Sequence, residues 1–533
     1  MSKHQTTNTK KVFVVCNDSN HKYLSEVMKI KKVCVIGAGI SGLVTAKTFI
    51  EEGYDVTVYE KLGAIGGVWE KSRRYPDIIT QTPGRIYAYP DYPLPDCYPE
   101  WPTGEQVNAY LESYANHFDL LKHIKFNTKV IAVNAIDNNG QFGWKVTTCT
   151  LEENTTIKHF DFVAICNGVN HIPNIPLVPG IDVFKKSGGT VLHTTQVNST
   201  TQLQGKNVLV VGIGKSACDI AMLAAEHARD CNLVYRKPDW KIPRFFFGFI
   251  NFKFLLFTRF AEAMSPKRKP NALQKWLHSK GKSLVNAFWR LNEAILRYSF
   301  KLDACGMIPE KPLVESLIAS ISIAPKNFYK YIRNRKIRTY QTSVTQFVED
   351  GVELASGEKL KIDVVVFGTG FQQALPFLEE KYRCQCLDNE GYFHLYRNLI
   401  HPNIPNLGFV GYNAGLSANL TSDIGARWLV EVVKGNINLP TTEQIITEME
   451  RDLEWRKSQG YAAYGGTCLF TSTFHYLDTL LHDMGLSARQ TGSITAIMQP
   501  LNTSFYKNLR AELQSLQHSD VKINMILKEG IYI

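Results

Sequence analysis

A strand, a glycine-rich turn, a helix and a second strand follow one another near the start of the chain, and this unit restricts the fold more than any other feature. Residues 31–36 read KKVCVI, a short β-branched run that predicts a buried parallel strand, and the chain then enters GAGISG. Gly37, Gly39 and Gly42 have the G-x-G-x-x-G spacing. There the first glycine permits a tight turn, the second lets the backbone approach a diphosphate, and the third lets helix and strand pack closely. The sequence therefore predicts a dinucleotide-binding unit.

The second strand of this unit, DVTVYE, ends in an acid, Glu60. This residue lies 18 positions after Gly42, where a carboxylate accepts hydrogen bonds from the ribose hydroxyls of an adenosine. The helix N-terminus adds amide donors and a partial positive charge. The stretch GAIGGVWEK follows, and in it Gly67 and Trp69 stand where a flavin-binding domain continues around the diphosphate. We expect all of these residues to contact one resident cofactor.

The same pattern returns 175 residues later, in KNVLVVGIGKSACDIAMLAAEHARDCNLVYRK. Gly212 and Gly214 precede an alanine-rich helix that opens with Lys215 and Ser216, and Ala217 replaces the third glycine while still allowing close packing. The chain therefore holds two dinucleotide sites, which indicates one resident cofactor and a second that delivers hydride.

The second unit differs from the first at the end of its second strand, where Arg236 stands in place of an acid. An arginine binds a 2′-phosphate that a carboxylate would repel, so this site is expected to prefer NADPH over NADH. The alternative is a surface arginine that simply follows an edge strand.

A third glycine turn occurs late in the chain, in the stretch IDVVVFGTGF at residues 362–371, which includes Gly370. An acid, a buried strand and a Gly-Thr-Gly turn have the form expected where a chain returns to its first domain after building a second. We therefore expect this strand to rejoin the first sheet, with Gly370 near the cofactor.

The fold class predicted is α/β, with two Rossmann-like dinucleotide-binding domains, the second inserted in the first, and a helical C-terminal region. A chain of 533 residues suits two or three domains. The C-terminal stretch TTEQIITEMERDLEWRKSQ has helical periodicity after a threonine cap. The expected divisions are an N-terminal extension at 1–30, a first domain at 31–170, a second domain at 171–330, the rest of the first domain at 331–440 and the helical region at 441–533. The extension either is dispensable or adds a strand from KVFVVC.

No stretch approaches the roughly 20 apolar residues that cross a bilayer, and the N-terminus lacks a secretory apolar core. The nearest candidate, Phe245–Phe260, reads FFFGFINFKFLLFTRF and is followed by the basic stretch SPKRKP. It is either an apolar patch that contacts a membrane surface or lines a substrate tunnel, or an ordinary buried helix. Eleven cysteines without a Cys-x-x-Cys pair indicate neither a zinc site nor a redox dithiol. We expect a cytoplasmic protein, with or without peripheral membrane contact, that has no metal and no nucleic-acid partner. The sequence leaves its oligomeric state open.

These motifs together resemble the flavin-containing monooxygenases over about residues 31–435. The resemblance is carried by VIGAGISGLVTAKTF, GGVW, YPEWPTGEQVNAYLESYANHFDL, ICNGVNHIPNIPLVPGI, VVGIGKSACDIA, VVVFGTGF and HPNIPNLGFVGY. It implies that FAD is resident, that NADPH reduces it, and that dioxygen then forms a flavin C4a-hydroperoxide. It also implies that an amine nitrogen or a thioether sulfur of a small substrate takes one oxygen atom.

The family fingerprint F-x-G-x-x-x-H-x-x-x-Y/F is only half present. Gly189 and His193 match its centre, whereas Ser187 and Val197 replace its aromatic ends. The resemblance places His193 at the hinge between the domains. Baeyer–Villiger enzymes, which convert a ketone to an ester, carry Trp at the trailing position, and Val197 does not match them either.

Two further positions depart from the family. Gln81 replaces the usual Asn, whose amide is thought to contact the flavin and its oxygen adduct, and Lys215 replaces an Asn beside the diphosphate of NADPH. Gln81 and His193 are the catalytic candidates that the resemblance implies. The departures keep two alternatives open: a Baeyer–Villiger enzyme, and an NADPH oxidase whose adduct decays to peroxide. A non-enzymatic NADPH sensor is a third.

Overall fold

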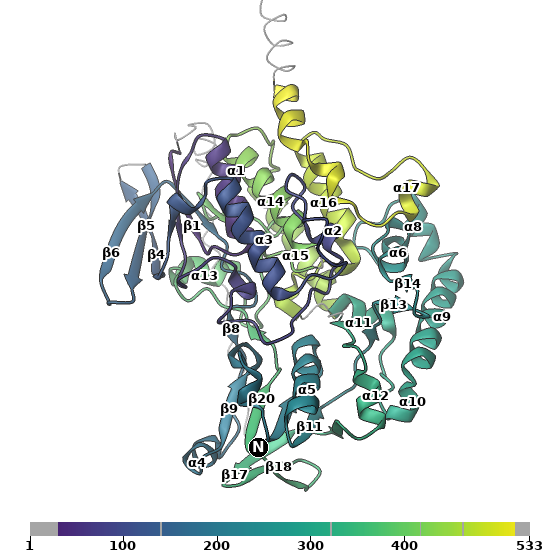
Figure 1. The fold of residues 1–533 in the computed structure, drawn as a ribbon. Helices are drawn as coiled ribbons and strands as arrows, with labels where there is room; N and C mark the ends of the chain where they lie inside the picture. The colour runs from purple at the N-terminus through teal and green to yellow at the C-terminus, as the bar shows by residue number, and fades with distance from the viewer. Residues whose placement is uncertain (1–29, 139–140, 320–321, 416, 461–462, 518–533) are drawn as a thin grey trace, which may run out of the picture.

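The computed structural model describes residues 30–138, 141–319, 322–415, 417–460 and 463–517. The N-terminal extension expected at 1–30 lies outside these residues except for Ile30, so neither interpretation of it is decided. Two five-stranded parallel sheets form the body of the chain, one above the other in Figure 1. The predicted α/β class with a helical C-terminal region is confirmed.

The central strand of the first sheet leads into the first glycine turn, and the first helix follows that turn. Its strand order is β22-β7-β1-β2-β3, with every neighbouring pair parallel. The central strand β1 is the KVCVI run, in which the last four residues are buried because both faces of the sheet are covered. The strands are β1 (Lys32–Ile36), β2 (Asp55–Tyr59), β3 (Ile124–Lys125), β7 (Phe162–Ile165) and β22 (Leu407–Phe409).

The second sheet repeats this arrangement around the second glycine turn. Its order is β16-β11-β10-β20-β9, again all parallel. The strands are β9 (Thr190–His193), β10 (Asn207–Val211), β11 (Asp230–Tyr235), β16 (Arg338–Gln341) and β20 (Val364–Phe367). Helix α5 (Lys215–His227) packs on it between β10 and β11.

The late strand β20 does not return to the first sheet, and that expectation is wrong. Val364 pairs with Val208 of β10 on one side and with Thr190 of β9 on the other. The glycine turn after β20 instead packs against the second glycine turn, since a Cβ on Gly212 would lie 2.4 Å from the carbonyl oxygen of Gly368. The chain rejoins the first sheet only at β22.

Two short strands join the sheets. The strand β8 (Ile172–Pro173) leads out of the first sheet and pairs antiparallel with β21 (Phe371–Gln372), which leads back from the second. Figure 1 shows β8 in the narrow region between the two bodies. The outgoing and returning chains are therefore hydrogen-bonded to each other.

A long buried helix covers the first sheet beyond α1 (Ile40–Glu51). It is α14 (Ala418–Val433), which packs along α1 and is buried over most of its length. The hydroxyls of Ser41 and Ser422 are 3.0 Å apart across this contact.

Helix α3 (Gly104–His117) follows a capping box, in which Thr103 and Gln106 each accept from the other's backbone amide. Antiparallel ribbons flank both sheets: β4 (Thr128–Asn138), β5 (Gln141–Thr150) and β6 (Thr155–Phe160) beside the first, and β17 (Val344–Val348), β18 (Gly351–Leu354) and β19 (Lys359–Lys361) beside the second.

The aromatic stretch at 245–260 is not a single buried helix. It forms the hairpin β13 (Phe245–Phe246) and β14 (Ile250–Asn251), then α6 (Lys253–Leu256) and the start of α7 (Arg259–Ala263). Phe246 and Phe252 are buried, whereas Phe247 and Phe249 at the hairpin tip are exposed. The stretch is therefore partly buried and partly exposed, and it combines a hairpin with two short helices.

Further helices pack around the two sheets and this hairpin, among them Phe328–Arg333, which contacts α5 of the second unit. The threonine cap predicted before α15 is confirmed, because Thr441 Oγ1 accepts from the amide of Gln444 at 3.3 Å and Gln444 Oε1 accepts from the amide of Thr441 at 3.1 Å. Within the described ranges no helix combines the length and apolarity that crossing a bilayer needs. The helices are α8 (Ala272–Leu277), α9 (Lys282–Phe300), α10 (Leu302–Cys305), α11 (Leu313–Ala319), α12 (Phe328–Arg333), α13 (Glu380–Cys386), α15 (Thr442–Ser458), α16 (Thr473–Asp483) and α17 (Ile494–Met498).

Candidate functional site

A cavity of about 560 Å³ opens at the carboxyl ends of β1, β2 and β7. This is the edge at which open parallel sheets bind nucleotides. Four of the residues that the sequence predicted for the resident cofactor line it: Gly37, Gly39, Glu60 and Gly67. The volume lies within the roughly 300–1,000 Å³ usual for pockets that hold small molecules.

In the first turn, Gly37 and Gly42 stand where a larger side chain would clash with the backbone. Gly37 has φ +106°, and a Cβ there would lie 2.8 Å from the carbonyl oxygen of Cys166. A Cβ on Gly42 would lie 1.8 Å from the carbonyl oxygen of Gly37, so this residue lets α1 approach β1 and does not line the cavity. Gly39 begins α1, and no side chain caps that helix. Its first amides are thus left for an anion in the cavity, as a diphosphate requires.

Glu60 is buried with its carboxylate fixed by two backbone amides. Oε2 accepts from the amide of Ala38 at 2.8 Å and Oε1 from the amide of Leu62 at 2.9 Å. A carboxylate has about four acceptor positions, so two remain for the ribose hydroxyls of a bound dinucleotide. The donor and acceptor groups present therefore fit FAD.

Three cations that sequence reasoning missed also line this cavity: Lys61, Arg73 and Lys129. Burial lowers the pKa of the Lys61 amine and of the Arg73 guanidinium, the second against the attraction of Glu60. Arg73 Nη2 donates to the carbonyl oxygen of Asn170 at 2.7 Å. Three positive side chains around one carboxylate suit a diphosphate. Lys61 and Arg73 lie close in sequence to Glu60 and to the GGVW stretch, whereas Lys129 had no such signal.

Trp69 does not line the cavity. Its indole Nε1 donates to the hydroxyl of Tyr87 at 2.8 Å, and the two rings meet edge to face with centroids 5.9 Å apart. The structure thus places this residue in the core beneath the Gly66–Gly67 turn, where it supports the turn by packing.

The second glycine turn has the same geometry at the end of β10. Gly212 has φ +125°, and Gly214 begins α5 without a side-chain cap and with open space around it. Arg236 is exposed just beyond β11. These positions suit a dinucleotide whose diphosphate faces the α5 N-terminus and whose 2′-phosphate reaches Arg236.

Lys215 is held by an acid one helical turn later. Its Nζ donates to Asp219, and the hydroxyl of Tyr75 donates to the same carboxylate at 2.6 Å. Ser216 also hydrogen-bonds Tyr75, whose pKa is raised well above its usual range, chiefly by burial. Tyr75 follows the first dinucleotide unit in sequence, so this cluster connects the first unit directly with α5 of the second.

His193 lies at the end of β9 and is completely buried. Its Nδ1 accepts from the amide of Thr195 at 3.3 Å, and its Nε2 is 3.0 Å from the carbonyl oxygen of Gly370. The ring is therefore neutral with its proton on Nε2, and burial lowers its pKa. Gly370 immediately precedes β21, so His193 joins the second sheet to the returning linker.

Gln81 lies apart from both predicted glycine turns, and no hydrogen bond within the described residues joins it to His193. Its Oε1 accepts from the amide of Ile323 at 3.0 Å. Ile323 belongs to β15 (Ser322–Ile323), which pairs with β12 (Lys241–Ile242). The amide nitrogen of Gln81 remains available as a donor.

Several buried polar atoms near Gln81 have no hydrogen-bond partner among the described residues: Thr80 Oγ1, Lys241 Nζ and Ser322 Oγ. Lys241 and Ser322 are register partners on neighbouring strands, so both side chains project from the same face. The Lys241 side chain is 1% exposed, and its nearest carboxylate, that of Asp239, lies 3.5 Å away. Buried groups without partners are rare unless a bound molecule completes them. Sequence reasoning gave no indication of this cluster.

Comparison with known proteins shows which family the chain belongs to. The family model described as flavin-binding monooxygenase-like matches residues 30–490. The "probable flavin-containing monooxygenase 1" of Arabidopsis thaliana is 30% identical over 516 residues, covering 89% of this chain and 96% of the relative. Dimethylaniline monooxygenase (N-oxide-forming) 2 of Oryctolagus cuniculus is 30% identical over 474 residues, with coverage of 85% and 83%.

Solved structures share the fold. The S-allyl-L-cysteine S-oxygenase of Allium sativum superposes with a TM-score of 0.59 at 20% identity, covering 86% of this chain and 89% of that one. The complex of OTEMO with FAD and NADP gives a TM-score of 0.62 at 18% identity, with coverage of 81% and 91%. The chain thus belongs to the flavin-containing monooxygenase family and is a flavin-dependent monooxygenase that uses FAD and NADPH.

Proposed function

We propose that the chain oxygenates a soft nucleophile, an amine nitrogen or a thioether sulfur, of a small molecule with one atom of dioxygen. The observation that supports this over ketone oxidation is the 30% identity with the N-oxide-forming relative over 85% of this chain. Val197 departs from the aromatic residue of both the family fingerprint and the Baeyer–Villiger pattern and does not decide between them. The N-oxide-forming relative covers most of the chain, whereas the cyclohexanone monooxygenase structures are 18% identical and match in fold alone.

The first site would hold FAD by its phosphates and its ribose. The amides at the start of α1 and the side chains of Lys61 and Arg73 would face the diphosphate, and Glu60 would accept from the ribose. When bound, FAD takes hydride from NADPH and activates dioxygen for transfer of one oxygen atom.

The second site would hold NADPH at the N-terminus of α5. Arg236 would pair with the 2′-phosphate, and Gly214 would let the diphosphate approach the backbone. Lys215 would act indirectly, because its ammonium pairs with Asp219, the carboxylate that also accepts from Tyr75 and so joins α5 to the first unit. Gln81 would donate its amide N–H to the flavin or its substrate, since its oxygen is already engaged by Ile323. Gly42, Trp69, Ser216 and Gly370 would support these sites through the backbone and packing contacts described above.

We also propose revised domain limits. The linkers β8 and β21 would bound the second domain, at about residues 174–370, with the first domain on either side of it. This division follows from the parallel partners of β16 and β20, which both lie in the second sheet.

The function is tested by reducing the FAD-loaded protein with NADPH, admitting oxygen, and measuring peroxide and product together. A thioether, a tertiary amine and a cyclic ketone serve as the three substrates. We expect sulfoxide or N-oxide with peroxide release well below the NADPH consumed. Ester from the ketone alone would favour the Baeyer–Villiger alternative. Stoichiometric peroxide with all three substrates would overturn oxygenation.

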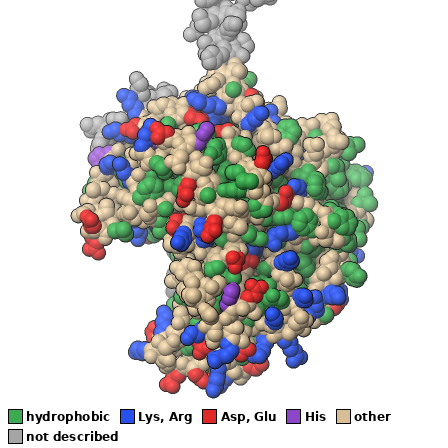
Figure 2. All heavy atoms as spheres, in the orientation of Figure 1, with side chains coloured by type: hydrophobic (Ala, Val, Ile, Leu, Met, Phe, Trp, Pro, Cys, Tyr) green, Lys and Arg blue, Asp and Glu red, His purple; other side chains and the backbone are tan. Residues whose placement is uncertain are grey.

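We further propose that the chain contacts a membrane surface through an apolar patch. The patch comprises the hairpin tip, α6, α8, α9 and α17, and its exposed side chains are Phe247, Phe249, Phe254, Trp276, Leu284, Leu291 and Ile494. Figure 2 shows hydrophobic side chains gathered on the side where Figure 1 places these elements. Exposed Lys275, Lys280, Lys282 and Arg290 lie on or between α8 and α9. Apolar side chains with cations beside them suit an anionic lipid surface.

A further inference from the structure

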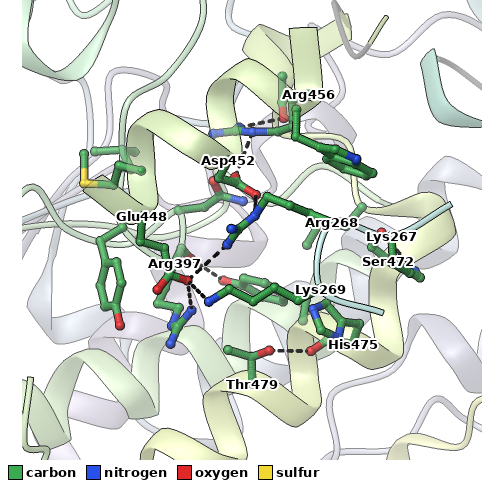
Figure 3. A pocket seen from close by; sticks show the side chains of 18 of the residues that line it. Lys267, Arg268, Lys269, Arg397, Glu448, Asp452, Arg456, Ser472, His475 and Thr479 are labelled. Carbon is green, nitrogen blue, oxygen red and sulfur yellow. Dashed lines mark hydrogen bonds and ion pairs between the residues drawn. The ribbon is translucent and has the colours of Figure 1, made fainter. Parts of the chain in front are cut away.

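The chain contains a second cavity, of about 220 Å³, that shares no lining residue with the cofactor cavity. It lies where the basic loop between α7 and α8 meets α15, α16 and the turn at 396–399 (Figure 3). The basic loop contains the SPKRKP stretch, and all three of its cations, Lys267, Arg268 and Lys269, line this cavity. Neither FAD nor NADPH accounts for this loop.

Three cations converge on one oxygen at the wall of this cavity. Glu448 Oε1 accepts from Lys269 Nζ at 2.7 Å, from Arg397 Nη1 at 3.1 Å and from Arg268 Nη2 at 3.2 Å. These side chains come from a loop, a turn and the helix α15, and Figure 3 shows them directed toward one point. The three cations keep the pKa of Glu448 below its ordinary value although burial opposes them. Glu448 is therefore a carboxylate that occupies an oxyanion-binding position.

The cations keep donors that Glu448 does not use. Arg268 has five N–H groups and directs two of its nitrogens to carboxylates, Nε to Asp452 at 3.1 Å and Nη2 to Glu448. Lys269 has three N–H groups, one hydrogen bond and a half-exposed side chain. The same cluster can thus bind a further oxyanion beside Glu448.

The charge of the lining is positive. Two carboxylates line the cavity, those of Glu448 and Asp452. The cations that line it number five: Lys267, Arg268, Lys269, Arg397 and Arg456. Two other acids, Glu262 and Asp483, pair with Lys267 and Arg397 from outside the lining. One positive charge remains after every acid is matched, so an anion is favoured over a neutral or cationic molecule.

The remainder of the lining is apolar and aromatic, including Leu395, Tyr396, Met449, Leu469 and Tyr476. A volume of about 220 Å³ is below the roughly 300 Å³ at which pockets for drug-sized molecules begin, so the occupant is small. We propose that this cavity is a second binding site, for the oxyanion of a small organic acid or phosphate compound with a short apolar body.

The test uses the FAD-loaded protein with saturating NADP⁺, which fills the second dinucleotide site and removes its own phosphate binding. Benzoate and inorganic phosphate are titrated by calorimetry, with benzamide as an uncharged counterpart of benzoate. We expect benzoate to bind at millimolar concentration or better and benzamide to bind at least tenfold more weakly. The two anions separate a carboxylate site from a phosphate site.

Two substitutions locate the binding. Lys269→Ala removes one donor from a half-exposed residue and is expected to weaken anion binding about fivefold to tenfold. Glu448→Gln removes the resident carboxylate and is expected to tighten anion binding by a similar factor, because the ligand no longer meets a like charge. The matched control is Lys359→Ala. Lys359 is also an exposed lysine paired with an acid, Glu353, but it lies on β19 and does not line the cavity.

A purely structural ion-pair network gives a different result from a binding site. In that case Glu448→Gln lowers stability and leaves anion binding absent or unchanged. Anion binding that is equal in wild type, Lys269→Ala and Lys359→Ala would overturn the proposal, as would no binding of either anion at 10 mM. Lys269→Ala keeps the test decisive should Glu448→Gln fail to fold, because its side chain is about half exposed.

Discussion

At the scale of single residues, Asp423 shows how burial can outweigh nearby cations in setting the pKa of a carboxyl group. It lies on α14 with 4% of its surface exposed, and burial raises its pKa to about 6 although Lys47 and Arg427 oppose the shift. The folded chain therefore binds this proton more tightly than the unfolded chain does. The protonated Asp423 carboxyl therefore contributes its full share of the free energy of unfolding below about pH 4, and this contribution is lost as pH rises through about 6.

Asp423→Asn should remove this loss. A shift from 3.8 to about 6 corresponds to about 3 kcal/mol at pH 7.5, so the variant should be more stable there by up to about that amount. The gain should shrink as pH falls from 6 to 4. Urea unfolding of both proteins at pH 7.5 and pH 4.5 measures it, and a variant that is less stable at both values contradicts the burial argument.

The two glycines of the second turn allow a matched pair of substitutions. Gly214→Ala places a methyl in open space at the start of α5, where the diphosphate of NADPH would approach. We expect the KM for NADPH to rise about tenfold or more, with melting temperature and FAD content unchanged. Gly212→Ala is the contrast, because its φ is +125° and its Cβ would lie 2.4 Å from the Gly368 carbonyl oxygen. That variant should unfold at lower temperature, and equal KM values for wild type and Gly214→Ala would contradict the placement of NADPH.

Which residues the sequence could predict depends on how local their role is. Gly37, Gly39 and Glu60 were predictable because one turn and one strand end define them, and all three line the cofactor cavity. Lys241 and Ser322 were not, because only the pairing of β12 with β15 brings them together. A buried lysine without a hydrogen bond has no pattern in sequence until its strand partner is known.

At the scale of elements, the linker pair β8 and β21 is one connection between the two sheets, beside the contact of Tyr75 with α5. His193 extends this link, since its Nε2–H donates to the Gly370 carbonyl one residue before β21. We expect His193→Ala to slow flavin reduction by NADPH about tenfold, because the second site then moves more freely relative to FAD. FAD content and the KM for NADPH should stay near wild-type values.

The matched variants separate positioning from general destabilisation. His193→Gln can restore a side-chain N–H donor and should recover part of the reduction rate. His227→Ala changes an exposed histidine at the end of α5 and should have no effect. Stopped-flow reduction measured at pH 6, 7 and 8 checks this. Equal rates for His193→Ala and wild type would show that the contact with Gly370 does not position the cofactors.

The place of an element in the fold was predictable where the sequence carried a complete strand–turn–helix–strand pattern. It was not predictable where a strand could pair equally well in either of the two sheets. The first and second glycine units carry strand, turn, helix and strand in order, so both formed as expected. The run VVVF of β20 is equally suited to either sheet, because any buried parallel strand reads as a short apolar run. Its partners Val208 and Thr190 lie far along the chain, and only their register decides its place.

At the scale of the whole molecule, the helices inserted in the second unit and those after the first sheet meet on one side and form the apolar patch. The bridge between Thr258 and Pro500 and the hydrogen bond from the Leu501 amide to the Phe257 carbonyl at 2.8 Å join these segments. Residues from both parts of the chain therefore share one exposed surface. Sequence reasoning found only the 245–260 stretch, because the contributions of α8, α9 and α17 gather in space and not along the chain.

Membrane contact should consequently depend on the exposed aromatic residues and not on the buried ones. Phe247 and Phe249 are 58% and 75% exposed at the hairpin tip, so replacing both with Ser should leave the melting temperature within about 2 °C of wild type, as is usual for surface substitutions. Flotation with vesicles that contain anionic lipid should fall severalfold for this variant, and wild-type binding should weaken at high salt because Lys275, Lys280 and Lys282 contribute by charge. Leu177→Ser is the control, since that leucine is fully exposed beside β8 and outside the patch. Equal flotation of the double variant and wild type, or no flotation of either, would remove the lipid surface as the partner and leave the patch to another occupant.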